Sequence, residues 1–165
     1  MSKIKLFTDS TCDLTDEILE KFDISVVPLY VHFNEDAFKD RIEINTEELY
    51  KKVEEYGTLP MTAAPSPGDF YNAFKPFVDD GREILYIGLS SLISSTVQNA
   101  TIAKSDFEDA KIEIVDTLNL STAEGLLLFK AVELIDQHMK LEDIGNALRA
   151  MIPKVRTSFV VDTAC

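Results

Sequence analysis

Side-chain hydroxyls are concentrated in the segment from Leu89 to Ala100, which reads LSSLISSTVQNA. Four serines and one threonine fall between positions 90 and 96. An apolar run precedes the segment and a helical period follows it, so the hydroxyls stand where a strand turns into a helix. Ser95 and Gln98 match a capping box, in which two side chains bind backbone N–H groups at a helix start. One serine is enough for capping, whereas the remaining hydroxyls and N–H groups suit an anion. The spacing leaves both interpretations open.

Two further loops carry the same chemistry after predicted strands. TDSTCDLT spans positions 8–15 and DTLNLST spans positions 116–122. Ligands of open parallel sheets bind beyond the carboxyl ends of the strands, so the three loops predict one binding edge. Asp9 and Asp116 would there suit a metal-dependent enzyme acting on a small phosphorylated or hydroxylated metabolite. The simpler interpretation is turn chemistry, in which Asp and Ser bind their own backbone. The residues expected at the edge of the pocket are Asp9, Ser10, Ser91 and Thr96.

Other reactive side chains are few and scattered. The two cysteines are Cys12 and Cys165, and the two histidines are His32 and His138. Cys12 as a nucleophile would need a basic partner. His138 is better explained as a cap at a helix C-terminus, and His32 as a packed or solvated strand residue. The spacings do not match a zinc site, and the chain contains no G-x-x-x-x-G-K-S/T phosphate loop. Apart from the metal alternative above, we predict no cofactor and no metal site.

The elements that would position these loops follow from hydrophobic periodicity. Strands are predicted over residues 3–8, 24–33, 83–88, 111–116 and 157–165, and helices over 15–22, 45–56, 66–78, 95–109, 121–137 and 141–151. Pro28 indicates an edge or a break in the second strand, and residues 34–44 indicate a hairpin or an ordered loop. This order predicts an α/β three-layer sandwich with a mostly parallel sheet.

Capping residues mark several helix boundaries. The predicted capping pairs are Asn45 with Glu48, Ser66 with Asp69, and Ser121 with Glu124. Gly57 and Pro153 are predicted to end two of the helices. The helix after residue 121 is apolar on nearly every side over its middle, so it is either deeply buried or covered by a partner.

Composition limits the classes of function. The 165 residues are 45% hydrophobic, which is enough for one domain with a core. The chain has 16 Lys and Arg residues and 29 Asp and Glu residues, which gives a formal net charge of -13. That charge argues against nucleic acid and against anionic lipid headgroups as partners. No apolar run reaches the roughly 18 residues of a membrane span, and the first residues lack the apolar core of a signal peptide. We therefore expect a cytoplasmic protein.

Several motifs together resemble the DegV family. LFTDSTCDLT and ISVVPLYVHFNEDAFKDRIEI match the family's first two strands and the segment after them. PMTAAPSPGDF resembles P-x-T-S-Q-P-S-P-G-x-F, with Ala63 and Ala64 replacing Ser-Gln. IGLSSLISSTVQNA resembles I-x-I-S-S-x-L-S-G-T-Y-Q-S-A, with Ser95 and Val97 replacing Gly and Tyr. VVDT, with Arg156 ahead of it, matches R-x-x-x-x-V-D-T. The motifs occur in order along the whole chain.

The resemblance implies a protein that binds fatty acids. Thr62, Ser94 and the backbone N–H of Ser95 would hold the carboxylate of a long-chain acid. The acid would be presented to a separate fatty acid kinase, so that the chain is a carrier rather than an enzyme. The resemblance also implies that residues 1–165 form the N-terminal domain, with the family's C-terminal domain absent. Since the acyl tail lies between the two domains in the family, we expect weak binding, or self-association that covers the exposed apolar face, unless the second domain exists as another chain.

Overall fold

Four parallel strands form the central sheet of the computed structural model, which describes residues 3–158 and 160. Their order across the sheet is β2 (Ile24–Val27), β1 (Ile4–Asp9), β6 (Glu83–Gly88) and β7 (Ile112–Asp116). All six residues of β1 are buried, because helices cover both faces of the sheet. Strands buried on both faces read as continuous apolar runs, as β6 does. The predicted α/β class and the mostly parallel sheet are confirmed.

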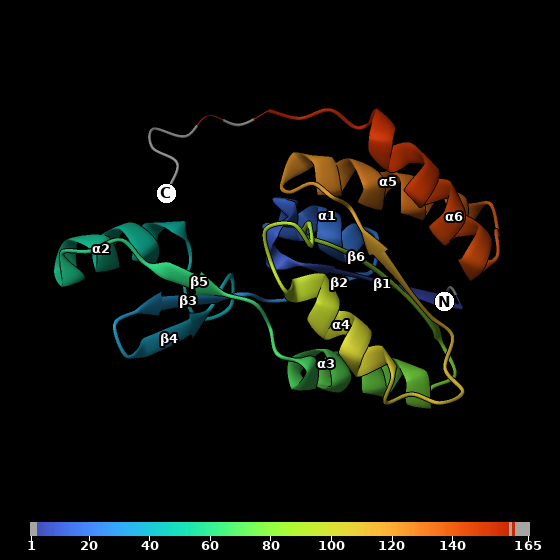
Figure 1. Cartoon of the computed structure of the whole chain (residues 1–165), viewed down its shortest axis with the longest axis horizontal. Coiled ribbons are helices and arrows are strands. Elements are labelled where there is room, and N and C mark those ends of the chain that lie inside the picture. Colours follow the sequence, from blue (N-terminus) through green and yellow to red (C-terminus); the bar gives the residue numbers. More distant parts are fainter. Residues whose placement is uncertain (1–2, 159, 161–165) are drawn as a thin grey trace.

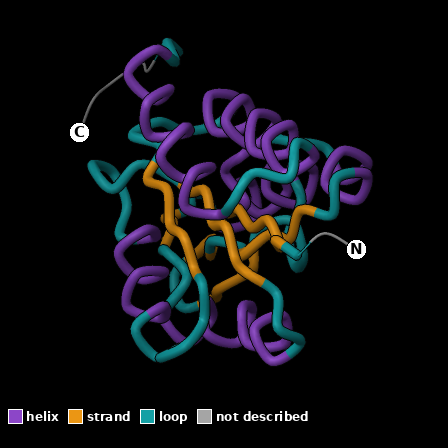
Figure 2. The backbone as a smooth tube through the Cα atoms, turned by 90° about the vertical axis from the view of Figure 1, so that its right-hand side faces the viewer, coloured by secondary structure: helices purple, strands orange, loops and turns teal. Residues whose placement is uncertain are grey.

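The helices form a layer on each side of this sheet. The helices are α1 (Asp16–Lys21), α2 (Thr46–Tyr56), α3 (Pro67–Asp79), α4 (Thr96–Lys104), α5 (Thr122–Asp136) and α6 (Leu141–Met151), with short 3-10 turns at η1 (Ser10–Cys12) and η2 (Ile152–Lys154). Figure 1 shows α5 and α6 on one face and α3 and α4 on the other, and Figure 2 shows the strands between the two layers. Leu6 and Leu85 pack towards α5 and α6, whereas Phe7 and Tyr86 pack towards α3 and α4. Successive side chains of β1 and β6 point to opposite faces of the sheet and therefore pack into two separate hydrophobic cores.

The predicted strand over residues 24–33 is two strands in two different sheets. The chain breaks at Pro28, and β3 (Tyr30–Phe33) then pairs antiparallel with β4 (Asp36–Lys39) and β5 (Met61–Ala63). The hairpin expected for residues 34–44 is present, whereas β5 was not predicted. Val31, Phe33 and Ile44 form a small core with α2. In Figure 1 this second sheet and α2 lie beside the central sheet rather than on either of its faces.

Two of the predicted capping boxes are present. Asn45 Oδ1 accepts a hydrogen bond from the Glu48 N–H at 2.9 Å, and α2 ends at Gly57 with φ of 65°. Ser66 and Asp69 bind each other's backbone N–H groups at the start of α3. Each box lies within one helical turn, so local sequence is enough to specify it.

Other predicted boundaries are only partly right. Helix α4 ends at Lys104 rather than at residue 109. Helix α6 ends at Met151 and passes into the turn that contains Pro153, as predicted. Helix α5 is buried at Leu127 and Leu128 but exposes Leu126, so it is not buried all round. No helix in the described part of the chain is long and apolar enough to cross a membrane.

The strand predicted over residues 157–165 is largely untested. Thr157 and Ser158 lie in irregular backbone, whereas residues 159 and 161–165 are outside the described residues. The Thr157 hydroxyl donates to Asn119 Oδ1 at 3.2 Å. This bond brings the end of the described chain to the loop that follows β7.

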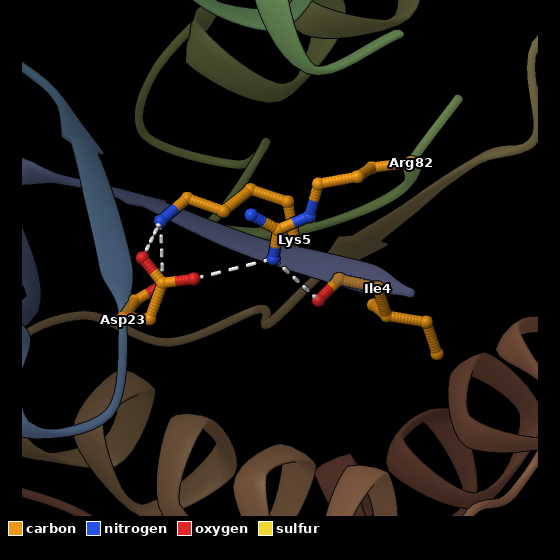
Figure 3. Close-up of polar contacts among 4 residues, drawn as sticks. All are labelled: Ile4, Lys5, Asp23 and Arg82. Carbon is orange, nitrogen blue, oxygen red and sulfur yellow. Dashed lines mark hydrogen bonds and ion pairs between the residues drawn. The ribbon is translucent and has the colours of Figure 1, made fainter. Parts of the chain in front are cut away.

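The amino ends of three central strands meet at one ion cluster, in which Lys5 is buried and Asp23 is exposed (Figure 3). Lys5 of β1 donates to the Asp23 carbonyl at 2.7 Å and forms an ion pair with its carboxylate. Arg82 donates to the same carboxylate and to the Ile4 carbonyl, both at 3.2 Å. Two cations share one carboxylate, and hydrogen bonding to both holds the pKa of Asp23 below its usual range although partial burial opposes this. The cluster fixes the end of the sheet that faces away from the hydroxyl-rich loops.

Candidate functional site

Three loops meet at the carboxyl edge of the central sheet, as the sequence predicted. The Leu89 N–H donates to Asp9 Oδ2 at 2.9 Å and so links the loop after β6 to the end of β1. The Ser91 N–H donates to Asp116 Oδ1 at 3.1 Å, and the Ser90 N–H donates to the Asn119 carbonyl at 2.9 Å. These bonds attach the hydroxyl-rich segment to both neighbouring strands.

Asp9 is completely buried, and both of its carboxylate oxygens accept two hydrogen bonds. Its Oδ2 accepts from Leu89 N and from Tyr86 Oη, both at 2.9 Å. Its Oδ1 accepts from Thr11 N at 3.0 Å and from Thr11 Oγ1 at 2.6 Å. Burial raises the pKa of Tyr86 well above its usual value, so this hydroxyl remains a donor. Tyr86 passes directly over Gly88, where an added Cβ would lie 2.2 Å from its oxygen.

The metal alternative gains no support from this geometry. Asp116 Oδ1 accepts from Ser91 N and from Leu118 N at 3.0 Å, and Asp9 is occupied as described. Ser10 is buried and its Oγ accepts from Leu29 N at 3.1 Å. Over residues 3–158 and 160, no three His, Cys, Asp or Glu side chains form a group that could hold a metal ion. The turn interpretation fits these contacts.

The start of α4 differs from the predicted Ser95–Gln98 capping box, which is wrong. Ser95 has φ of -80° and ψ of 4°, and its side chain makes no capping bond. Ser94 Oγ instead accepts from Thr96 N at 3.2 Å and lies 2.7 Å from Thr96 Oγ1. The hydroxyl that binds the first turn therefore belongs to Ser94, and Ser95 is left exposed.

Several backbone donors remain free at this helix start. Within the described residues, the N–H groups of Ser95, Val97 and Gln98 have no hydrogen-bond acceptor. Unpaired N–H groups at a helix N-terminus carry partial positive charge and favour an anion. Ser94 lies in the same turn with a partly exposed hydroxyl. The free N–H groups are therefore compatible with an anion site at the hydroxyl-rich segment. The prediction that the Ser95 side chain caps the helix is wrong.

Thr62 lies on the second sheet. It pairs with Val31 at the centre of β5 and is exposed. Asn99 of α4 donates to the Pro65 carbonyl at 2.8 Å, which ties the segment after β5 to the first turns of α4. No hydrogen bond among the described residues joins Thr62 to Ser94. The structure thus gathers Asp9, Ser10, Ser91, Ser94, Ser95 and Thr96 at one edge of the central sheet and leaves Thr62 on a separate strand tied to α4.

Large apolar side chains are exposed on the loops of this polar edge and on β5 of the second sheet. Leu92 and Ile93 are 80% and 63% exposed immediately before Ser94. Leu118, on the neighbouring loop, is 50% exposed, and Met61, next to Thr62, is 71% exposed. Apolar side chains beside free N–H groups suit an amphiphile whose head is anionic and whose tail is apolar.

Glu124 lies beneath this edge and is not the capping residue that the sequence predicted. The predicted Ser121–Glu124 capping box is wrong, because Ser121 has φ of 58° and its hydroxyl donates to Asp13. The Glu124 side chain is fully buried and contacts the hydroxyls of Thr8 and Thr11. Burial, aided by the charge of Asp9, raises its pKa well above the usual value. No signal in the sequence marked this burial, because Glu133 stands among apolar residues of the same helix and is exposed.

Among the described residues, Cys12, His32 and His138 lie apart from one another. Cys12 is fully buried, and burial raises its pKa to about 11. His32 lies on β3, with its ring 6.3 Å from that of Tyr30. His138 follows α5 with φ of 59°, and its backbone N–H donates to the Ile135 carbonyl at 2.9 Å. A thiolate nucleophile at Cys12 is therefore disfavoured.

Comparison with known proteins decides the family. Residues 3–164 match the family model described as "Uncharacterised protein, DegV family". The chain belongs to the DegV family. A DegV domain-containing protein of Clostridium perfringens is 39% identical over 148 residues, which cover 90% of this chain and 53% of that protein. One of Clostridium acetobutylicum is 36% identical over 162 residues, which cover 98% of this chain and 58% of the other. The chain thus spans a little over half the length of these DegV relatives.

Solved DegV structures share the fold. A DegV family protein of Thermus thermophilus, described for its fatty acid binding, is 32% identical with a TM-score of 0.82, covering 93% of this chain and 54% of that one. A stearic acid-binding protein of Eubacterium ventriosum is 31% identical with a TM-score of 0.81, covering 91% and 53%. DegV of Bacillus subtilis, described as a fatty acid binding protein, is 29% identical with a TM-score of 0.85, covering 93% and 55%.

Proposed function

We propose that this chain binds a fatty acid, with the carboxylate at the start of α4. The observation that carries the proposal is the set of free N–H groups at Ser95, Val97 and Gln98, next to the exposed apolar side chains of Leu92 and Ile93. The descriptions of the solved DegV relatives as fatty acid binding proteins support the same class of ligand.

The headgroup contacts follow from the local geometry. The Ser94 hydroxyl can receive a hydrogen bond from Thr96 and donate its own proton to a carboxylate. The Ser95 N–H supplies a second donor, and the exposed Ser95 hydroxyl, where the family usually has Gly, supplies a third. Thr62 is the donor that would approach from the second sheet.

The acyl tail dominates the affinity. A helix N-terminus contributes about 0.3–1 kcal/mol towards holding a charge. Each buried methylene contributes about 0.8 kcal/mol, so a tail of about 14 methylenes is worth on the order of 11 kcal/mol before ordering costs. Affinity therefore depends on how much of the tail this chain alone can cover.

The chain would act as a carrier that presents its acid to a separate fatty acid kinase. The exposed position of Ser95 supports this role, because a carboxylate bound there stays within reach of a second protein. Cys12, the described thiol nearest this edge, is buried and neutral and so is a poor nucleophile. Phosphorylation of the carboxylate would belong to the kinase.

The test combines lipid analysis with a matched pair of variants. Native mass spectrometry of the purified chain, followed by denaturing extraction, should show a bound fatty acid. Thr62→Ala with Ser94→Ala should then weaken palmitate binding at least about tenfold, because a hydrogen bond to a charged group contributes about 1.5–3 kcal/mol. Displacement of a fluorescent fatty acid measures the affinity.

The control is Thr58→Ala with Ser105→Ala, which removes two exposed hydroxyls bonded only to nearby carbonyls. It should bind palmitate like the unmodified chain. Equal affinity of the two double variants would remove Thr62 and Ser94 from the site. Absence of any lipid binding to the unmodified chain would refute the proposed function for this part of the protein.

A further inference from the structure

Two buried carboxyl groups share one threonine hydroxyl beneath the candidate site. Asp9 and Glu124 are both completely buried, and Thr11 lies between them. Thr11 Oγ1 is 2.6 Å from Asp9 Oδ1 and 3.2 Å from Glu124 Oε2. Glu124 Oε1 accepts from the Thr8 hydroxyl. The arrangement links β1, η1 and α5.

A hydroxyl has one proton to donate, and its oxygen can also accept. The shorter contact assigns the Thr11 proton to Asp9. A hydroxyl that donates to Asp9 keeps its contact with Glu124 Oε2 only by accepting a proton from Glu124. A neutral Glu124 would supply that proton, whereas Asp9 accepts hydrogen bonds from Thr11, Tyr86 and Leu89.

We propose that Glu124, held in its neutral form, is a positioning residue that fixes the start of the hydroxyl-rich segment through Thr11 and Asp9. The Asp9 oxygen that is not bonded to Thr11 holds the N–H of Leu89, the first residue of that segment. A proton on α5 thereby stabilises the loop after β6. This proposal goes beyond fatty acid binding and is tested without a ligand.

The charged and titratable surroundings favour the neutral form. From β1 Glu124 faces Asp9, from η1 and the turn after it Cys12 and Asp13, and from β6 Tyr86. These groups are acidic or neutral. Ionised Glu124 would place a second buried negative charge beside Asp9, which burial makes costly.

The sign of the pH dependence follows from proton binding. Because the folded-state pKa of Glu124 is raised above its ordinary value of 4.5, the folded chain binds more protons than the unfolded chain above that pH. The stability contributed by this proton is complete below the ordinary pKa and is lost as pH rises through the folded-state pKa. The melting temperature should fall relative to that of Glu124→Gln by about 3–5 °C per pH unit within this window.

The experiment compares melting curves between about pH 6 and about pH 9 for the unmodified chain, Glu124→Gln and Glu133→Gln. Glu133 lies on the same helix but is exposed, and ion pairing with Lys130 lowers its pKa, so its variant should follow the unmodified chain. Parallel curves for the unmodified chain and Glu124→Gln would overturn the proposal.

Two measurements in the unmodified chain do not depend on the folding of any variant. The carboxyl carbon of Glu124 in NMR spectra at neutral pH should have the chemical shift of a carboxylic acid, and the shift of a carboxylate would overturn the neutral form. Protection of the Leu89 amide against hydrogen exchange should decrease as Glu124 titrates. Constant protection through that titration would overturn its positioning role.

Discussion

At the scale of single residues, the carboxyl edge of the central sheet depends on side chains that are buried. Tyr86 on β6 holds one oxygen of Asp9, and Asp9 in turn holds the N–H of Leu89. Gly88 lies where Tyr86 crosses the backbone of its own strand. A buried polar network of this kind fixes a loop only when every member is satisfied. The positions of the exposed residues Ser91 and Ser95 therefore depend on the buried hydrogen bonds of Asp9.

Gly88→Ala should damage this network. An added Cβ would lie 2.2 Å from Tyr86 Oη, so Tyr86 must move away from Asp9. Overpacking and the lost buried hydrogen bond should together reduce the free energy of unfolding by about 2–4 kcal/mol. Urea denaturation measures the change. Gly68→Ala is the control, because its Cβ would meet Ser66 Oγ at an ordinary 3.6 Å and stability should be unchanged or increased. Equal stability of the two variants would contradict the role of Gly88.

Cys12 should be inert in the folded chain. Burial raises its pKa to about 11, so roughly one thiol in a thousand is ionised at pH 8. In a Cys165→Ser variant, a disulfide reagent at pH 8 should react with Cys12 only after unfolding in urea. Raising the pH towards 11 should speed the reaction, since the thiolate becomes populated. Rapid labelling of the folded variant at pH 8 would contradict this.

At the scale of elements, one local pattern, the capping box, was right at two helix starts and wrong at two others. The boxes at Asn45 and Ser66 lie within one turn and were predicted correctly. The boxes expected at Ser95 and Ser121 match the same pattern, yet they are absent. Glu124 is drawn into the core by Thr8 and Thr11, which lie more than a hundred positions away in the sequence. A pattern four residues long contains no information about such partners.

Substitution of the capping serines should show this difference. Ser66→Ala removes a true N-cap and should reduce the free energy of unfolding by about 1 kcal/mol. Ser95→Ala removes an exposed hydroxyl that makes no capping bond and should change it by less than about 0.5 kcal/mol. Chemical denaturation of both variants measures the contrast. A loss at Ser95 as large as that at Ser66 would mean that Ser95 caps α4 after all.

At the scale of the whole molecule, the alternation of strands and helices was enough to predict the parallel sheet and the meeting of three polar loops at its carboxyl edge. The second sheet was missed because β5 has only three residues, two of them exposed, and so lacks a readable alternation. Pro28 indicated the break between β2 and β3 but not that the two strands enter different sheets. Thr62 illustrates the consequence, since only family resemblance connects it to Ser94.

Charge and apolar surface act against each other when two copies of this molecule meet. The chain carries a formal net charge of -13, while Leu92, Ile93 and Leu118 expose apolar surface at the carboxyl edge. Repulsion between copies acts over about 30 Å at 0.01 M salt and about 8 Å at 0.15 M. We therefore expect the chain to be monomeric at low salt and to self-associate through this edge as salt increases, because burial of the apolar side chains is not screened.

Sedimentation velocity in a salt series tests this expectation. The sedimentation coefficient of the unmodified chain should rise between about 0.01 M and about 0.3 M salt. Leu92→Ser with Ile93→Ser should remove the rise, since each substitution removes about 1–2 kcal/mol of apolar burial from every copy. Ile42→Ser is the matched control, because Ile42 is 69% exposed but lies before α2. If the control abolished the rise as well, association would not involve the carboxyl edge. A monomer at every salt concentration would show that this edge is not covered by a second copy.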